Sequence, residues 1–256
     1  MAADAERAGW DGFFLWDHVL FAKDGPPVVD PWVALAAMAM ETERIRIGPM
    51  VTPLPRRRPW IVARQSVALD HLSGGRFVLG VGLGAPPEVE LAPFGETVDV
   101  RSRAAMLDEA LEVITGLWSG EPFSFAGRHY QLDDVTFRPT PVQRPRIPIW
   151  VAGFWPNRAP FRRAARWDGA VPEKEDGIAP DDIRRIRALL EEERPAGAGT
   201  MEIVVGLESE GPPAQRVATV RGFAEAGATW WSERITPRRG SLDRMLALII
   251  DGPPRI

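Results

Sequence analysis

The chain has 256 residues, of which 45% are hydrophobic and 26% charged, and we expect a single domain over residues 1–256 with one large core. A formal net charge of −4 offers no basic field for nucleic acid, and the lack of cysteine excludes disulfides, thiolate metal sites and cysteine nucleophiles. The sequence shows neither a signal-peptide pattern nor an apolar run of membrane-spanning length, so we expect a cytoplasmic protein without a membrane partner.

Apolar runs rich in β-branched and aromatic residues alternate with segments of helical period along the chain, as in a parallel sheet built from βα units. Helices are predicted to open at Asp30-Pro31 and to run over 59–72, 100–118, 158–167, 178–195, 214–228 and 241–250. Strands are predicted over 12–19, 45–54, 76–85, 148–155, 168–172, 201–209 and 229–235.

Two segments interrupt this alternation. Residues 86–96 form a Pro-rich loop, and residues 121–139 alternate around a Gly-containing turn like a β-hairpin. We therefore place an insertion at approximately 86–147, outside the main repeat.

Seven predicted strands in βα order favour a TIM (β/α)8-type barrel over an open dinucleotide-binding sheet, which usually completes in fewer strands. The count is one strand short of a barrel. Residues 1–9 have the composition of a helix end, which in this repeat follows a strand, so the first strand is lacking. Either the chain start is assigned too late, or the barrel is truncated and something else, such as a dimer partner, covers its flanking strands.

Asp17 and His18 close the first predicted strand, at the edge where an α/β barrel carries its chemistry. Burying either side chain without a partner is costly. By itself, however, an Asp-His pair favours a capped strand end with a satisfied histidine over a catalytic pair.

Small residues close two other predicted strands. Gly82 and Gly84 let a ligand approach the backbone or mark a bulge, and Ala85 stands where a dinucleotide fingerprint needs its third glycine. Ala152 and Gly153 are small enough for backbone amides to meet a phosphate at the start of the next helix.

The remaining motifs bear on which classes of reaction the chain can carry out. Three arginines at 56–58 favour a solvated loop over a site for a polyanionic cofactor tail. The sequence contains no hydrolase motif and no histidine–carboxylate group at metal-ligand spacing, so we expect no metal. The residues alone therefore predict a barrel whose chemistry comes from a bound cofactor.

An ordered set of segments resembles the bacterial-luciferase-like family of flavin- or deazaflavin-dependent oxidoreductases. The segments are AERAGWDGFFLWDHV, TERIRIGPMVTP, ARQSVALDHLSGGRFVLGVGLG, RAAMLDEALEVITGLWSGEPFSFAGRHYQL, PVQRPRIPIWVAG and AARWDGAVP, and the match runs from Ala5 to about Pro254. The resemblance implies a TIM barrel with a hairpin-bearing insertion, and FMN or the deazaflavin coenzyme F-420 across its C-terminal face. It also implies hydride or oxygen chemistry on a small-molecule substrate, with a flavin reductase as partner where reduced FMN drives monooxygenation.

The resemblance also implies site residues by position. Asp17 and His18 match the family's Asp-His motif, where the imidazole faces the cofactor ring as an acid/base or hydrogen-bond partner, and this reverses the interpretation of His18 taken alone. The Met50–Val51 bond matches a non-prolyl cis peptide that backs the ring. The other matches are Gly82 and Gly84 near the cofactor, Ala152 and Gly153 at its phosphate, and Arg103 as a further phosphate contact.

Two departures leave two classes of function open. Some deazaflavin dehydrogenases of the family bear an acid directly after the glycines, where this chain has Ala85-Pro86-Pro87, and the first strand is lacking. These departures favour a non-catalytic flavin-binding or dimer-forming relative, whereas His18 and the glycine strand favour the active enzyme that we expect. Because an open barrel exposes strand edges, we also expect a homodimer.

Overall fold

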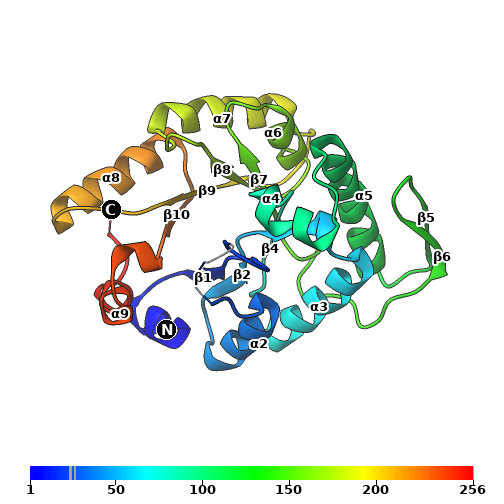
Figure 1. Ribbon diagram of the computed structural model, residues 1–256, viewed down its shortest axis with the longest axis horizontal. Helices are drawn as coiled ribbons and strands as arrows, with labels where there is room; N and C mark the ends of the chain where they lie inside the picture. Colours follow the sequence, from blue (N-terminus) through cyan, green and yellow to red (C-terminus); the bar gives the residue numbers. More distant parts are fainter. Residues whose placement is uncertain (23–24, 26, 256) are drawn as a thin grey trace. The chain divides into compact units, whose positions relative to one another are not determined.

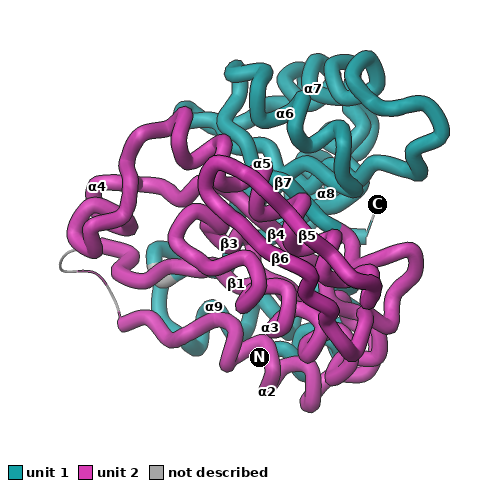
Figure 2. The backbone as a smooth tube through the Cα atoms, turned by 90° about the vertical axis from the view of Figure 1, so that its right-hand side faces the viewer, with its two compact units in different colours: residues 1–12, 149–256 teal, residues 13–148 magenta. Residues whose placement is uncertain are grey.

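The computed structural model describes residues 1–22, 25 and 27–255, and Figure 1 labels the elements along the chain. Two compact units are present (Figure 2). The first comprises Met1–Gly12 and Ile149–Ile256, and the second comprises Phe13–Pro148. The chain thus enters the second unit once and returns to the first at Ile149.

The first unit is built on parallel strands paired in the order β7, β8, β9, β10. Ala152 lies opposite Val171, and Trp230 lies opposite Val204. Parallel neighbours require crossover connections, which here contain helices. The elements are α1 (Ala2–Ala8), β7 (Ile149–Phe154), α6 (Ala159–Ala164), β8 (Gly169–Glu173), α7 (Pro180–Glu193), β9 (Glu202–Leu207), α8 (Pro213–Ala226), β10 (Trp230–Glu233), η3 (Pro237–Arg239) and α9 (Leu242–Asp251).

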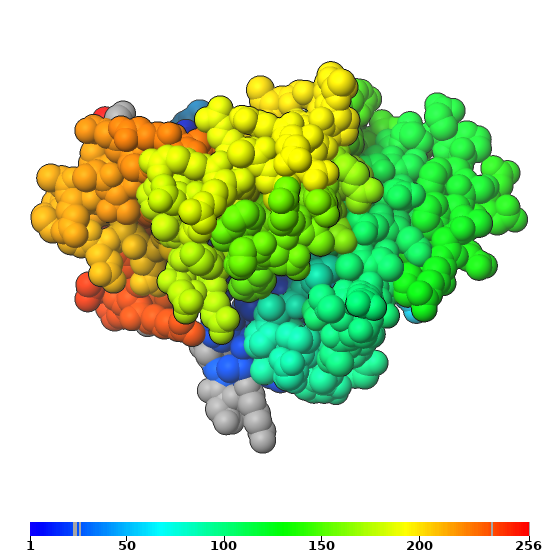
Figure 3. Space-filling model, turned by 90° about the horizontal axis from the view of Figure 1, so that it is seen from above, coloured from blue at the N-terminus to red at the C-terminus, as the bar shows by residue number. Residues whose placement is uncertain are grey.

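The helices of the first unit pack against its strands and against one another. α6 contacts β7, and α7 contacts both α6 and α8. α7 buries Ile183, Ile186 and Leu190 on one face, while its charged face forms part of the surface coloured yellow-green to yellow in Figure 3. α1 contacts α9, and Nε1 of Trp10 donates to the carbonyl oxygen of Ile249 at 2.8 Å.

The second unit contains short pairings. β3 pairs in parallel with β4, and β2 approaches β4 through a parallel bridge between Ile47 and Phe77. β1 and β2 form a two-stranded sheet, and β5 pairs antiparallel with β6. The elements are β1 (Gly12–Leu15), α2 (Pro31–Glu41), β2 (Arg46–Pro49), β3 (Thr52–Pro53), η1 (Leu54–Arg56), α3 (Pro59–Leu72), β4 (Leu79–Gly82), α4 (Pro87–Glu90), η2 (Ala92–Phe94), α5 (Val100–Trp118), β5 (Phe123–Ala126) and β6 (Gln131–Val135).

Local signals start the long helices of this unit. Asp30 caps α2 by accepting hydrogen bonds from two amides of the first turn, and a proline occupies the first helical position. Asp99 caps α5 through the amide of Ser102. α5 then packs along α3, and this contact forms much of the core of the unit.

Two glycines let the strands of the second unit approach closely. A Cβ on Gly48 would lie 2.1 Å from the carbonyl oxygen of Val78, and a Cβ on Gly80 would lie 2.2 Å from that of Pro49. A side chain at either position would force the backbone apart. The glycines therefore hold the end of β2 beside the start of β4.

The α/β class with parallel strands is confirmed, and the helix over 100–118 lies where the sequence predicts it. Two expectations are corrected. The strand expected over 45–54 is divided into β2 and β3, and residues 86–96, expected as a loop, contain α4 and η2. α4 forms because Pro87 takes the first helical position, where a missing amide hydrogen costs nothing. The barrel stays a prediction.

Within the described residues, no helix is both long and apolar enough to cross a membrane. The same residues contain no group of three or more His, Cys, Asp or Glu side chains placed to hold a metal ion.

Candidate active site

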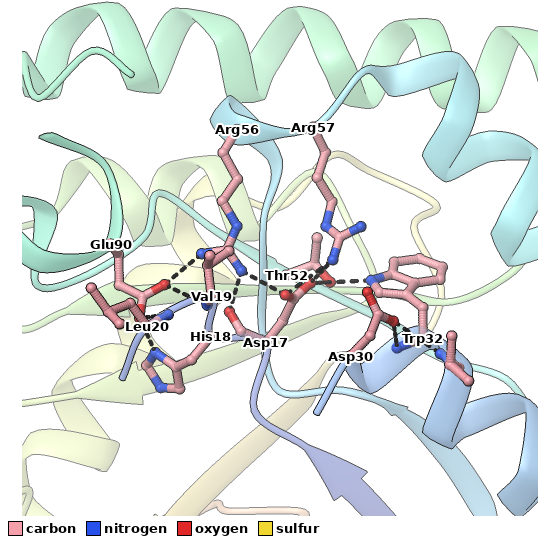
Figure 4. Close-up of polar contacts among 11 residues, drawn as sticks. Asp17, His18, Val19, Leu20, Asp30, Trp32, Thr52, Arg56, Arg57 and Glu90 are labelled. Carbon is pink, nitrogen blue, oxygen red and sulfur yellow. Dashed lines mark hydrogen bonds and ion pairs between the residues drawn. The ribbon is translucent and has the colours of Figure 1, made fainter. Parts of the chain in front are cut away.

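A cluster of charged side chains lies in the second unit, just beyond the end of β1 (Figure 4). Asp17 and His18 follow β1, Arg56 ends η1, and Glu90 ends α4. The fold of this unit brings together three segments that are far apart in the sequence.

The carboxylate of Asp17 accepts several hydrogen bonds in the cluster. Its carboxylate accepts from the hydroxyl of Thr52 at 2.8 Å and from Nε1 of Trp32 at 3.1 Å. Nη2 of Arg56 lies 2.6 Å from Oδ1, and Nη2 of Arg57 lies 3.0 Å from Oδ2. Burial alone would raise the pKa of Asp17, but the two guanidinium groups and the hydrogen bonds hold that pKa below its usual value. Asp17 is therefore a buried, fully paired anion.

Arg56 and Glu90 connect Asp17 to His18. Arg56 donates from Nη1 to Oε2 of Glu90 at 2.7 Å and from Nη2 to the carbonyl oxygen of Asp17 at 2.6 Å. Glu90 also accepts from the amide of Val19 at 3.0 Å, and its side chain is 1% exposed. Burial opposes the charged form of Glu90, but the Val19 amide, His18 and Arg56 hold the pKa of Glu90 below its usual value. One cation thus serves two buried carboxylates.

His18 lies at the outer end of the cluster. Its Nδ1 is 2.9 Å from Oε1 of Glu90, and its side chain is 23% exposed. The rings of Trp16 and Phe21 meet the imidazole edge-on, with centroid distances of 5.8 and 4.9 Å. Nε2 makes no hydrogen bond to any residue that the structure describes. One ring nitrogen is therefore bound to a buried carboxylate, and the other has no partner among the described residues.

The cis peptide bond expected from the family resemblance is present between Met50 and Val51. The amide of Met50 donates to the carbonyl oxygen of Leu15 at 2.7 Å, and Thr52 reaches Asp17, so the bond lies beside the end of β1. A place behind a cofactor ring stays a prediction.

Arg103 lies in the same unit and holds the loop that follows β4. Its Nη1 donates to the carbonyl oxygens of Leu83 at 3.1 Å and Gly84 at 2.7 Å. Gly84 has a φ of +88°, in the left-handed region that favours glycine, and Gly82 pairs with Pro53. Burial lowers the pKa of Arg103, whose Nε has no hydrogen-bond partner among the described residues. Contacts of these three residues with a cofactor stay predictions.

Ala152 and Gly153 lie in β7 of the first unit. A Cβ on Gly153 would lie 2.4 Å from Cβ of Pro160, so packing between β7 and α6 accounts for this glycine. α6 has only six residues, which gives its N-terminus little dipole for a phosphate. A phosphate contact at these two residues stays a prediction.

Sequence reasoning missed Glu90 and misjudged two arginines. Arg56 and Arg57, expected in a solvated loop, bind Asp17 with side chains that are largely buried, whereas Arg58 is exposed as expected. Buried carboxylates need counter-ions, but a run of arginines in the sequence does not show which of them will lie against a buried carboxylate. For Glu90, the available signal was the pair of prolines before an acidic segment, which is a helix-start pattern.

Comparisons with known sequences identify the family of the chain. Residues 1–207 match the model of the luciferase-like monooxygenase family. An uncharacterized protein of Mycobacterium bovis is 36% identical over 208 residues, which cover 73% of this chain and 68% of that protein. An F-420-dependent glucose-6-phosphate dehydrogenase of Kineococcus radiotolerans is 30% identical over 239 residues, which cover 89% of this chain and 68% of the dehydrogenase.

Solved structures show a similar fold. A monooxygenase from Streptomyces bottropensis has a TM-score of 0.84 at 20% identity, covering 97% of this chain and 88% of that one. The oxygenating constituent of 3,6-diketocamphane monooxygenase from Pseudomonas putida, in complex with FMN, has a TM-score of 0.68 at 19% identity, covering 96% and 75%. Because the family match spans most of the sequence, the chain belongs to the luciferase-like monooxygenase family.

Proposed function

We propose that the protein is a flavin- or deazaflavin-dependent oxidoreductase that acts on a small organic substrate, with His18 at the reaction centre. The observation that carries this proposal is the pairing of His18, whose Nδ1 is bound to a buried carboxylate while Nε2 has no partner among the described residues. The F-420-dependent relative and the FMN-bound structural neighbour support both choices of cofactor.

The residues around His18 fit a planar cofactor ring. The carboxylates of Asp17 and Glu90 are buried and paired, so neither is available to a metal ion. Among the described residues of this cluster, Nε2 of His18 has no hydrogen-bond partner. It belongs to an imidazole that contacts the ring of Trp16, a residue that is 42% exposed. An aromatic surface with a single hydrogen-bonding nitrogen suits a flat ring system better than a metal ion.

When bound, FMN or F-420 supplies the hydride or oxygen chemistry. His18 would hold or accept a proton at Nε2, the ring nitrogen that has no partner among the described residues. Glu90, Arg56 and Asp17 keep the imidazole in place, so no reorganisation of the polar cluster is needed when charge develops at His18. Asp17 therefore acts as a positioning residue in this scheme.

Equilibrium binding tests the cofactor choice. Calorimetric titration of the purified chain with FMN and with F-420, side by side, should give micromolar or tighter binding of one of them. Binding of neither would contradict the proposal for this chain.

His18→Ala tests the reaction centre. We expect turnover to fall far more than cofactor affinity, because the imidazole acts on the reacting atoms. His71→Ala, which removes an exposed histidine of α3, is the matched control and should leave both unchanged. Equal losses of turnover and affinity in His18→Ala would make the residue structural.

A non-catalytic flavin-binding or dimer-forming relative is the second candidate, because no acid directly follows the glycines at Ala85-Pro86-Pro87. Cofactor binding without turnover of any alcohol, sugar, alkanal or imine would favour it.

Three further features belong to the proposal. They are a (β/α)8-type barrel, a homodimer that works in the cytoplasm, and a flavin reductase as partner if FMN is the cofactor. Light scattering tests the dimer, and a monomer at micromolar concentration would contradict it.

A further inference from the structure

We propose that Glu90 is a positioning residue that fixes the tautomer of His18, with hydrogen on Nδ1 and a lone pair on Nε2. The consequence for catalysis rests on the proposed function, but the tautomer itself does not. Neutral histidine in water favours the opposite tautomer, with hydrogen on Nε2, so the protein must impose this one.

The contact between Glu90 and His18 determines which atom carries the hydrogen. Oε1 of Glu90 lies 2.9 Å from Nδ1 of His18. Because Arg56 and the amide of Val19 both donate to Oε2, Glu90 is held as a carboxylate, which only accepts hydrogen bonds. The hydrogen between Glu90 and His18 must therefore be on Nδ1.

The imidazole ring of His18 also has a single orientation. Trp16 and Phe21 meet the imidazole at interplanar angles of 88° and 82°. A ring turned by half a revolution would place a carbon against Oε1 and leave that buried oxygen with only the long contact to the amide of Leu20, at 3.4 Å. The contact with Glu90 therefore fixes both the ring and its proton.

The consequence is a rule for the ligand. A neutral His18 meets it through an acceptor, so the group opposite Nε2 is a hydrogen donor, such as a hydroxyl or an N–H. If His18 takes that proton, the ligand O–H or N–H bond breaks and an N–H bond forms at Nε2. The imidazolium so produced is paired with the carboxylate of Glu90.

Nuclear magnetic resonance of the ¹⁵N-labelled chain tests the tautomer without any cofactor. The sequence has three histidines, so the imidazole nitrogens can be assigned. His71 is an internal reference, because its Nε2 lies 2.8 Å from the carbonyl oxygen of Thr140 and must carry hydrogen. For neutral His18 we expect the reverse pattern, with an excess of the Nδ1–H form of at least about tenfold. A neutral His18 with hydrogen on Nε2 would overturn the proposal.

Glu90→Gln should invert this pattern. Arg56 and the amide of Val19 both need an acceptor where Oε2 stood, at 2.7 and 3.0 Å, whereas the amide of Leu20 lies farther from Oε1, at 3.4 Å. The glutamine therefore turns its carbonyl oxygen to Arg56 and Val19 and its NH₂ group to His18. Nδ1 must then accept, and hydrogen moves to Nε2. An unchanged tautomer in the folded variant would also overturn the proposal.

Three variants complete the test. Glu88→Gln changes an exposed glutamate in α4, and Glu233→Gln changes a buried one in the first unit; both should leave the His18 pattern unchanged. Glu90→Asp keeps the charge and should retain hydrogen on Nδ1. If Glu90→Gln does not fold, the wild-type and Glu90→Asp spectra still decide. If the tautomer prediction is wrong, the result of the cofactor titration does not change, so the proposed tautomer and the proposed function can be contradicted separately.

Discussion

Glu90 in the second unit and Glu233 in the first are buried to the same degree but have different partners. Their side chains are 1% and 2% exposed. Both carboxylates accept hydrogen bonds from a backbone amide, an arginine and a ring nitrogen. For Glu233 these donors are the amide of Ser209 at 2.9 Å, Arg239, and Nε1 of Trp231 at 2.9 Å.

The difference lies in the ring. An indole N–H only donates and does not titrate, whereas an imidazole bound through Nδ1 still has Nε2 to offer. Glu233 therefore belongs to a closed, structural cluster, and Glu90 supports a group that can exchange a proton with a ligand. In these two clusters, burial of the carboxylate is the same, and only the reactivity of its ring partner differs.

The largest loss of stability is expected from Arg56→Met, which removes the cation shared by Asp17 and Glu90. Both buried carboxylates then lose the cation that they share, while Asp17 keeps its ion pair with Arg57, and the free energy of unfolding should fall by about 3–5 kcal/mol. Urea denaturation followed by circular dichroism measures this loss. Arg239→Met is the matched variant, and it should lose less because Arg239 pairs with one carboxylate, that of Glu233. A larger loss in Arg239→Met would reverse our ranking of the two clusters.

A smaller effect is expected from Glu233→Gln. The amide replaces one acceptor oxygen by a donor, so a buried hydrogen bond is lost and the free energy of unfolding should fall by about 1–3 kcal/mol. Calorimetry should find the cofactor affinity of the folded variant unchanged. A clear loss of cofactor affinity would contradict a purely structural role of Glu233 and place it in the functional site.

Local patterns account for the parts of the fold that the sequence predicts well. The amphipathic period of residues 100–118 and the Asp30-Pro31 cap indicate α5 and the start of α2, because these signals lie within one or two helical turns. α4 was missed because four residues carry no measurable period. The cis bond at Met50–Val51 was expected only through the family resemblance, since its own residues give no such signal.

The site was harder to predict because its contacts are distant in the sequence. His18 and Glu90 are 72 residues apart, and Arg56 reaches Asp17 across 39. A sequence pattern identifies the Asp-His pair as notable but does not show which carboxylate or cation will lie against it. Burial, which turns Arg56 from a solvated residue into a shared counter-ion, is a property of the folded unit.

Acid should weaken the cluster around Glu90. The pKa values of Asp17 and Glu90 are both lowered in the folded chain. Such a carboxyl adds stability above its unfolded pKa of about 4 and loses that contribution as the pH falls through its folded pKa, with about 1.4 kcal/mol for each unit of lowering. The urea midpoint should therefore fall as the pH drops from about 5 to about 3, and Asp17→Asn should flatten this dependence. An equal slope in Asp17→Asn would contradict the role of Asp17 as a buried anion.

The smallest effect is expected on α7, where Nε of Arg187 lies 2.8 Å from Oε1 of Glu191 and both side chains are more than half exposed. Arg187→Met should change the free energy of unfolding by at most about 0.5 kcal/mol, because water and salt screen the pair. The contact is almost as short as that between Arg56 and Glu90, at 2.7 Å. If Arg187→Met cost as much as Arg56→Met in the same urea titration, contact distance would govern both pairs. If the two losses of unfolding free energy differ several fold, exclusion of water sets the strength of the buried ion pairs. Those pairs include the contact of Arg56 with Glu90, which holds His18 in place.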